Sequence, residues 1–400
     1  MATPFEIHVS EQRLDRLKQK LSLTDYPSGI LSADANSWEK GVPVAEIKRL
    51  AEYWKTSFDW RKVERELNTM PQFLTPIEID GFGSYNIHHI HKRSKRTDAI
   101  PLLFLHGWPG CFHEVSKMLD GLVTGTEGEP VFHVIAPSLI DFGFSDPNNL
   151  KTRFGFEQHA EAYHRLMKTL GYNTYVIQAG DVGGLVSRYI AKTYGPGHCK
   201  AHHTNTPTPS QPTEKDHPEL HDKTQTTPLT EAEQKGLGRT AHFQADGSGY
   251  FKQQTTRPLT IGYCLCDSPV GLLSWIYEKM RDWSDSYPWT DDEILTWVSI
   301  YYFSTAGPEA SINLYYEMEH SDPPAFAVAG SFVDVPLGIS RFANDLVVLP
   351  KLWNQTMGPV VYENDEPHTK GGHFAAWENP EAIVGDLRKM FGSGRKVRFS

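Results

Sequence analysis

The chain has 400 residues, of which 39% are hydrophobic and 22% are charged, and its formal net charge is −10 at pH 7. This is the composition of a globular protein with a sizeable core, in one large domain or two modest ones. The negative charge comes without a concentrated basic patch, so nucleic acid is not an expected partner. Four cysteines do not make a disulfide framework, and the sequence shows neither a signal peptide nor an apolar stretch of about 18 residues. We therefore expect a cytoplasmic protein without a transmembrane anchor.

Residues 1–75 carry mainly helical signals. Ser10 is of a residue type that caps helix N-termini, and Leu14 and Leu17 follow it at helical spacing. Residues 45–68 repeat the helical pattern. We expect an N-terminal helical segment that covers part of the remaining fold.

Residues 76–205 alternate between short apolar runs and helical patterns. The runs end in Gly, Pro or polar residues, as strands do, and a helix is predicted over 157–170. The predicted strands are 76–80, 86–91, 101–106, 131–136 and 174–179. Strands that alternate with helices predict a parallel sheet, whose active site lies beyond the carboxyl ends of the strands.

Residues 206–305 are interpreted as a helical lid inserted over the sheet. A stretch rich in Pro, Thr, Gln and Lys gives way there to a helical region rich in tryptophan. Residues 306–400 are predicted to return to the core. We expect strands at Ala325–Ala329 and Val360–Tyr362 and a closing helix over 378–391.

Asp181 is the most informative residue of the chain. It directly follows the predicted strand 174–179 and has Ala179 two residues before it and Gly183 two residues after it. Small neighbours let the backbone make a sharp strand-to-helix turn that lifts the side chain above the sheet, as in the nucleophile elbow of hydrolases. A carboxylate in the usual place of serine favours attack at an sp³ carbon, because the resulting alkyl ester can be cleaved by water. The elbow therefore points to the opening of a strained ring or the expulsion of a halide.

A histidine and a second acid are expected after the nucleophile in chain order. His373 fits best, because it lies in a glycine-flanked loop after the last predicted strand. Asp345 is the preferred acid, on a loop that follows the strand predicted to end near Ala329, and Asp334 is its competitor. Together with Asp181 they predict a catalytic triad.

An oxyanion hole requires backbone N–H groups close to the nucleophile. The turn His106–Gly110 directly follows a predicted strand and is the expected source of one donor. The predicted donors are the N–H groups of Trp108 and Val182.

Six short segments resemble one known family. They are Phe58–Arg61, Leu105–Gly110, Pro137–Leu139, Phe142–Ser145, Gly180–Gly183 and Gly371–Glu378. The chain is similar over nearly its whole length to epoxide hydrolases of the microsomal type, especially the soluble fungal members. This resemblance implies the α/β-hydrolase fold: a mostly parallel central sheet flanked by helices, with a helical lid and an N-terminal helical extension. It also implies a small-molecule epoxide as substrate and allows a homodimer formed through the N-terminal segment and the lid.

The resemblance implies two lid tyrosines that hydrogen-bond the epoxide oxygen. Tyr250 matches the first motif and Tyr315 the second, with Tyr316 as a rival. Phenols suit this task, because they donate to a developing alkoxide without requiring a low pH. The sequence departs from the family pattern at Cys111 and at Asp141, a loop carboxylate that we expect to face solvent.

The expected reaction is hydrolysis of an epoxide to a vicinal diol through an ester on Asp181, without a cofactor or a metal ion. A haloalkane dehalogenase is disfavoured, because Val182 stands where such enzymes carry a tryptophan. An epoxide-opening cyclase or a non-catalytic binding protein on the same scaffold remains an alternative. Metal binding by His88, His89 and His91 is disfavoured, because strand alternation places His88 on the opposite face from the other two.

Overall fold

The computed structural model describes residues 1–28, 36–148 and 153–392. Within these residues, nine strands form one sheet in the order β1-β2-β3-β5-β4-β6-β7-β8-β9. The strands are β1 Thr3–Pro4, β2 Gln72–Ile79, β3 Gly83–Lys92, β4 Ile100–Leu105, β5 Phe132–Pro137, β6 Tyr175–Ala179, β7 Cys199–Thr204, β8 Leu337–Ile339 and β9 Val360–Glu363. Pairing is antiparallel from β1 to β5 and parallel from β5 to β9.

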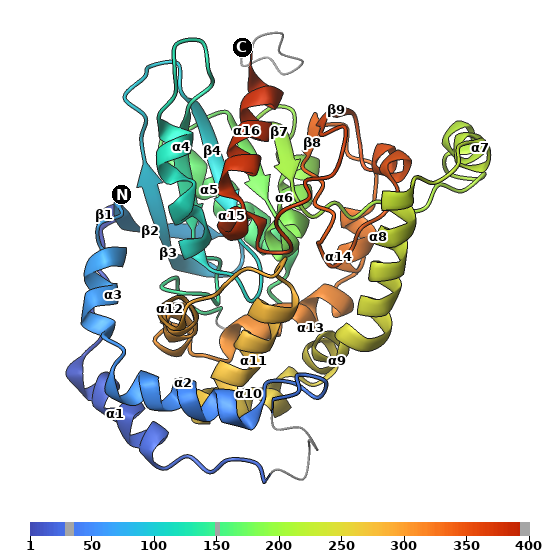
Figure 1. The fold of residues 1–400 in the computed structure, drawn as a ribbon. Coiled ribbons are helices and arrows are strands. Elements are labelled where there is room, and N and C mark those ends of the chain that lie inside the picture. Colours follow the sequence, from blue (N-terminus) through green and yellow to red (C-terminus); the bar gives the residue numbers. More distant parts are fainter. Residues whose placement is uncertain (29–35, 149–152, 393–400) are drawn as a thin grey trace.

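Helices cover both faces of this sheet (Figure 1). Helices α5 and α6 pack against each other on one face, and α4 and α16 lie on the other. The flanking helices are α4 Leu119–Val123, α5 Phe156–Thr169, α6 Asp181–Tyr194 and α16 Pro380–Phe391. The predicted α/β-hydrolase fold is thereby confirmed.

The segment between β7 and β8 is helical. Its helices are α7 Pro218–Thr226, α8 Glu231–His242, α9 Gly249–Thr256, α10 Pro258–Asp267, α11 Pro269–Asp282, α12 Asp291–Tyr302, α13 Asn313–His320 and α14 Ala325–Ala329. Helix α13 begins after residue 305 and packs closely on α9. The division of the chain at residues 75, 205 and 305 stays a prediction.

One predicted strand is wrong. Ala325–Ala329 forms helix α14, and the strand that returns to the sheet is β8. The run begins after Pro324 and buries Ala325, Val328 and Ala329, a helical spacing that five apolar residues cannot distinguish from a short buried strand. Strand β7 was not predicted.

The N-terminal helices are α1 Glu11–Ser22, α2 Val44–Thr56 and α3 Trp60–Leu67. Ser10 caps α1 as predicted, and the single pattern over 45–68 is two helices, the second capped by Asp59. In Figure 1, α1 and α2 run along the helices that lie between β7 and β8, and both contact α11. The Arg13 guanidinium donates to the carbonyl oxygens of Tyr302 and Phe303 at the end of α12.

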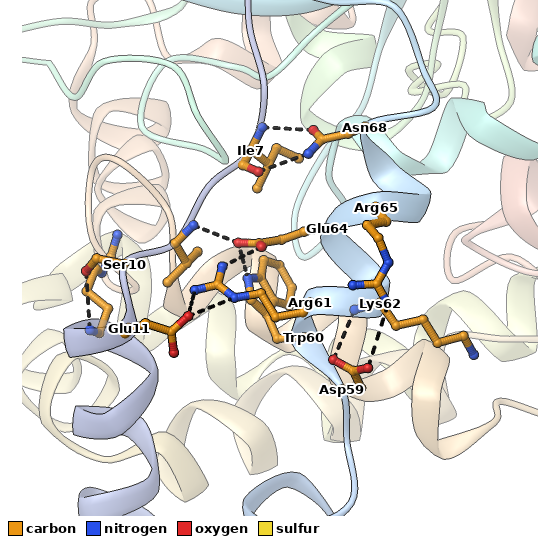
Figure 2. A network of polar contacts seen from close by, with 12 residues as sticks. Ile7, Ser10, Glu11, Asp59, Trp60, Arg61, Lys62, Glu64, Arg65 and Asn68 are labelled. Atoms are coloured by element: carbon orange, nitrogen blue, oxygen red, sulfur yellow. Dashed lines mark hydrogen bonds and ion pairs between the residues drawn. The ribbon is translucent and has the colours of Figure 1, made fainter.

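Figure 2 shows how α3 holds the first residues of the chain. The buried Glu64 carboxylate accepts the Val9 N–H at 2.6 Å and the Trp60 indole N–H at 2.8 Å, and it pairs with Arg61 at 2.5 Å. Asn68 exchanges two hydrogen bonds with the backbone of Ile7. The motif Phe58–Arg61 therefore supports the N-terminal segment.

Replacing Glu64 by alanine should lower the free energy of unfolding by ~3 kcal/mol, because two buried N–H groups lose their acceptor and Arg61 loses its buried partner. Chemical denaturation measures the change. The matched control is Glu66→Ala on the same helix, whose carboxylate is 64% exposed and 3.8 Å from Lys62. The control should change stability by less than ~0.5 kcal/mol, and equal losses in the two variants would contradict this role of Glu64.

Candidate active site

Asp181 lies at the sharp junction between β6 and α6. Its φ of 49° is in the left-handed region that non-glycine residues seldom adopt, as expected for a strained turn that projects a side chain. A Cβ atom at residue 183 would lie 2.4 Å from the Leu105 carbonyl oxygen, and one at residue 107 would lie 2.2 Å from Asp181 Oδ1. Glycine at these two positions lets the elbow pack directly against the end of β4.

His373 reaches the elbow from the loop after β9. Its Nε2 is 3.5 Å from Asp181 Oδ2, and its Nδ1 is 2.9 Å from Asp345 Oδ1. Asp345 is buried on the loop after β8, and the same Oδ1 accepts the Leu346 N–H at 2.7 Å. The structure thus brings together the three residues predicted as a triad. Asp334, the competitor of Asp345, is exposed just before β8.

The loop that carries His373 is fixed against the residues that follow α11. The His373 N–H donates to the Trp283 carbonyl oxygen at 2.9 Å, and the Gly371 N–H donates to Asp285 at 3.0 Å. A Cβ atom at residue 372 would lie 2.6 Å from the Trp283 carbonyl oxygen, so only glycine permits this approach. These contacts fix the position of the backbone that carries the imidazole.

The charges around His373 determine its protonation state. Burial alone would lower its pKa, but the Asp345 carboxylate, assisted by Asp181, raises the pKa of His373 to about 10. In the free protein the imidazole is therefore protonated and lies between two carboxylates. It cannot accept a proton until one of these negative charges is removed.

One predicted oxyanion donor contacts Asp181. The Trp108 N–H donates to Asp181 Oδ1 at 2.7 Å. Two side chains of α12 fix the turn that carries it: Trp297 donates to the Pro109 carbonyl oxygen and Tyr301 to that of Gly110, both at 2.6 Å. Val182 follows Asp181 in the first turn of α6, and the role of its N–H stays a prediction.

Tyr250 on α9 and Tyr315 on α13 are buried next to Trp108. Their ring centroids lie 5.2 and 5.6 Å from that of Trp108, and 6.0 Å from each other. Burial, and then the charge of Asp181, raise the pKa of Tyr250, and burial raises the pKa of Tyr315 well above its usual value. Both phenols are therefore protonated donors at neutral pH. The rival Tyr316 instead stacks on His320 at 3.9 Å.

A cavity of about 610 Å³ connects these groups. Asp181, His373, Asp345, Tyr250 and Tyr315 all border it. The remaining lining is largely apolar and includes Leu185, Phe243, Phe251, Met318, Phe326 and Leu346. The pocket can enclose an apolar molecule of moderate size with its reactive carbon at the Asp181 carboxylate.

Comparison with known proteins identifies the family. A family model described as the epoxide hydrolase N terminus matches residues 2–115, and one described as the alpha/beta hydrolase fold matches residues 100–253. Epoxide hydrolase 1 of Sus scrofa is 30% identical over 428 residues, which cover 97% of this chain and 88% of that protein. The chain belongs to the epoxide hydrolase family.

Two solved epoxide hydrolases have the same fold over almost their whole length. The Aspergillus niger enzyme is 34% identical with a TM-score of 0.82, and the match covers 97% of this chain and 95% of that one. The juvenile hormone epoxide hydrolase of the silkworm Bombyx mori is 27% identical with a TM-score of 0.86, covering 97% and 93%. As a member of this family, the chain is a hydrolase that acts on epoxides.

Several residues of this epoxide hydrolase site were missed by the sequence reasoning. Three of them lie in the helical region between β7 and β8: Trp283, Trp297 and Tyr301. No sequence pattern distinguished them from the other aromatic residues of that region. Their role follows only from their contacts with loops that are distant in sequence. Glu114 is a fourth such residue: it is buried next to the Trp108 turn and lines a second cavity with Asp181. A glutamate seven residues after Gly107 carries no pattern that would have found it.

The expectation that Asp141 faces solvent is wrong. Its carboxylate is buried rather than solvent-facing, and it accepts hydrogen bonds from both the backbone and the side chain of Asn148. Its φ of 72° belongs to a tight turn that this pairing stabilises. The carboxylate borders neither cavity at Asp181.

His88 and His89 of β3 form hydrogen bonds with neighbouring side chains of the epoxide hydrolase. His88 bonds Ser138 and Gln72, and His89 bonds Thr75. Within residues 1–28, 36–148 and 153–392, no three His, Cys, Asp or Glu side chains are grouped so as to hold a metal ion.

No helix in these ranges is long and apolar enough to cross a bilayer alone. Helices α10 and α11 have the required length and composition only as a pair, and this pair is bent by 116°.

Gly183→Ala should reduce turnover by at least ~100-fold, because the added Cβ collides with the end of β4 and shifts Asp181. Steady-state kinetics with an aryl epoxide measures the loss. The control Gly385→Ala places a Cβ on α16 with no atom within 4 Å. It should keep full activity and raise stability by ~1 kcal/mol. Wild-type turnover by Gly183→Ala would contradict the close-packed elbow.

Proposed function

We propose that the chain hydrolyses an apolar epoxide to a vicinal diol through a covalent ester on Asp181. The observation that carries the proposal is that the two carboxylate oxygens of Asp181 have different contacts. Oδ1 receives the Trp108 N–H, and Oδ2 faces His373. One oxygen is thus placed in an oxyanion hole while the other is available to attack.

In the first half-reaction, Asp181 Oδ2 attacks one epoxide carbon, a carbon–oxygen bond forms and the ring bond on that carbon breaks. The epoxide oxygen becomes an alkoxide that accepts hydrogen bonds from Tyr250 and Tyr315. The two phenols border the same pocket as the nucleophile. Neutral donors already in place stabilise charge that develops only in the transition state, which is where binding accelerates a reaction.

The proton balance follows from the charges of the site. The alkoxide needs one proton, and the imidazolium of His373 holds one in the free enzyme. Esterification neutralises Asp181 and removes one of the two carboxylates that raise the pKa of His373. The imidazole that was protonated before ring opening is then neutral and can act as a base.

In the second half-reaction, His373 takes a proton from a water molecule that attacks Cγ of Asp181, and Asp345 stabilises the imidazolium that forms. The tetrahedral oxyanion at Oδ1 is held by the N–H groups of Trp108 and Val182. Cleavage of the bond between Cγ and Oδ2 releases the diol, because the leaving Oδ2 takes the second proton of the attacking water, and the water oxygen stays on Asp181 as part of a carboxylate. The enzyme returns to its starting charges.

An epoxide-opening cyclase would use the same lid and base but an internal hydroxyl instead of the ester. The contact between the Trp108 N–H and Asp181 favours hydrolysis, because a cyclase has no acyl oxyanion to stabilise. Halide displacement is less well supported, because the polar donors that face Asp181 across the pocket are phenols rather than the tryptophan N–H groups of a halide site. The Trp108 indole instead packs against the rings of Tyr250 and Trp283.

We also propose that the enzyme acts in the cytoplasm as a homodimer formed through the N-terminal segment and the lid. The four cysteines are free thiols, which suits a reducing compartment. Leu259 and Tyr263 of α10 are 67% and 70% exposed, an apolar surface on the lid that a second subunit would cover.

A single turnover in heavy-oxygen water tests the ester. With enzyme in excess over the epoxide, the label should enter the Asp181 carboxylate, and the diol of the first cycle should carry none. Mass spectrometry of the diol and of the peptide around Asp181 measures both. Label in the first-cycle diol would exclude the ester and favour direct attack of water.

Asp181→Asn mimics the neutral ester in size and charge. The pKa of His373 should fall from about 10 by roughly one unit or more, because one of its two carboxylate partners is gone. NMR titration of the imidazole measures the shift. Asp365→Asn, at a fully exposed carboxylate, should leave the His373 titration unchanged. An unaltered pKa in Asp181→Asn would contradict the proposed switch from acid to base.

A further inference from the structure

A second, smaller cavity borders the nucleophile. Its volume is about 20 Å³, which is enough for one water molecule. Asp181 and His373 border both this cavity and the larger pocket that accommodates the epoxide. The two residues therefore separate a water-sized space from the substrate pocket.

The walls of the small cavity are polar. Gln178 lines it with an amide oxygen that is buried without a hydrogen-bond partner, while its NH₂ group donates to Asn205 at 2.9 Å. A buried acceptor without a partner is costly, and a water molecule in the cavity would satisfy it. Asn205 also lines the space, so the wall offers several groups that can hold water in a fixed orientation.

Glu114 supplies the remaining charged group of this wall. It lies on the 3₁₀ helix Phe112–Lys117, and its Oε1 accepts the Cys111 N–H at 3.2 Å. A Cβ atom at residue 110 would lie 1.8 Å from this Oε1, so Gly110 leaves the room that the carboxyl group occupies. Burial raises the pKa of Glu114 to about 8, a rise that the positive charge of His373 moderates and that of Asp181 increases.

The choice of glutamate is informative. An amide would accept the Cys111 N–H equally well, so capping alone does not require a buried acid. Burying an ionisable group costs free energy, and such groups tend to be found where a reaction needs them. In this cavity Glu114 lies across a water-sized space from the base and the nucleophile.

We propose that the small cavity holds the water molecule that cleaves the Asp181 ester, and that Glu114 orients this water together with His373. The inference rests on the ester mechanism proposed above. One O–H bond of the water donates to His373 Nε2 and the other to a carboxyl oxygen of Glu114. A lone pair then faces Cγ of Asp181 from one face of the planar ester group. The oxygen bonds to Cγ, its proton passes to His373, and the bond between Cγ and Oδ2 breaks.

Glu114→Gln separates this role from capping. The amide has one oxygen, and while this accepts the Cys111 N–H, its NH₂ group faces the cavity. The amide nitrogen has no lone pair to accept the water O–H, whereas both oxygens of the carboxyl group can accept. Rapid mixing with styrene oxide, followed by acid quench and mass spectrometry of the alkylated protein, measures ester formation and ester hydrolysis separately. We expect ester formation within about threefold of wild type and hydrolysis slowed roughly 10- to 100-fold, so that the ester accumulates.

Gly110→Ala provides a second variant, because its Cβ displaces the Glu114 carboxyl group without removing it. It should also slow hydrolysis selectively. The matched control is Glu317→Gln, at a buried glutamate of α13 that borders neither cavity at Asp181. Both of its rates should equal those of wild type, and thermal unfolding of each variant reports on the fold.

The outcomes distinguish this inference from the proposed function. Wild-type hydrolysis rates in both Glu114→Gln and Gly110→Ala would overturn the role of Glu114, and so would equal slowing of the two steps, which is the signature of a structural role. Failure of the wild-type enzyme to form any ester would instead overturn the ester mechanism. Selective accumulation of the ester in the two variants, with the control unchanged, supports the assignment.

Discussion

The structure is organised around one imidazole held between two carboxylates in a buried site. Asp345 and Asp181 raise the pKa of His373 to about 10, so the resting site contains a compact set of alternating charges. Such a set is stable only while its geometry is maintained, because a buried carboxylate without a partner is expensive. In the proposed mechanism, esterification of Asp181 removes one of the two negative charges. The imidazole then loses the contact that keeps it protonated and can act as a base in the second half-reaction.

Much of the chain that lies outside the sheet keeps this arrangement in place. Helix α12 holds the turn of Trp108 through Trp297 and Tyr301, and the backbone of Trp283 holds the loop of His373. The N-terminal segment in turn fixes α12, since Arg13 binds carbonyl oxygens at its C-terminal end. The contacts extend from the first helix to the nucleophile through two layers of side chains. An extension that forms no part of the pocket can therefore affect its geometry.

The sequence allowed prediction of those features that depend on local geometry. Asp181 could be identified because a sharp turn needs small neighbours, and the alternating strands and helices of residues 76–205 followed from periodicity. Asp345 was selected from its place in the chain order, although the strand thought to precede it proved to be helix α14. Strand β7 was missed, because its polar residues Lys200, His202 and His203 obscure the apolar pattern, and the structure buries both histidines. Glu114 and Asp141 could not be assigned either, because their burial depends on contacts that no local pattern reports.

Trp108 performs two tasks with two parts of one residue. Its backbone N–H contacts the Asp181 carboxylate, while its indole packs against the rings of Tyr250 and Tyr315. In the proposed mechanism these two contacts serve different half-reactions, so both half-reactions depend on the position of one residue. A shift of α9 and α13 that admits a bulkier epoxide would move the indole and, through the same residue, the proposed oxyanion donor. The proposed mechanism therefore couples substrate range to the rate of ester hydrolysis.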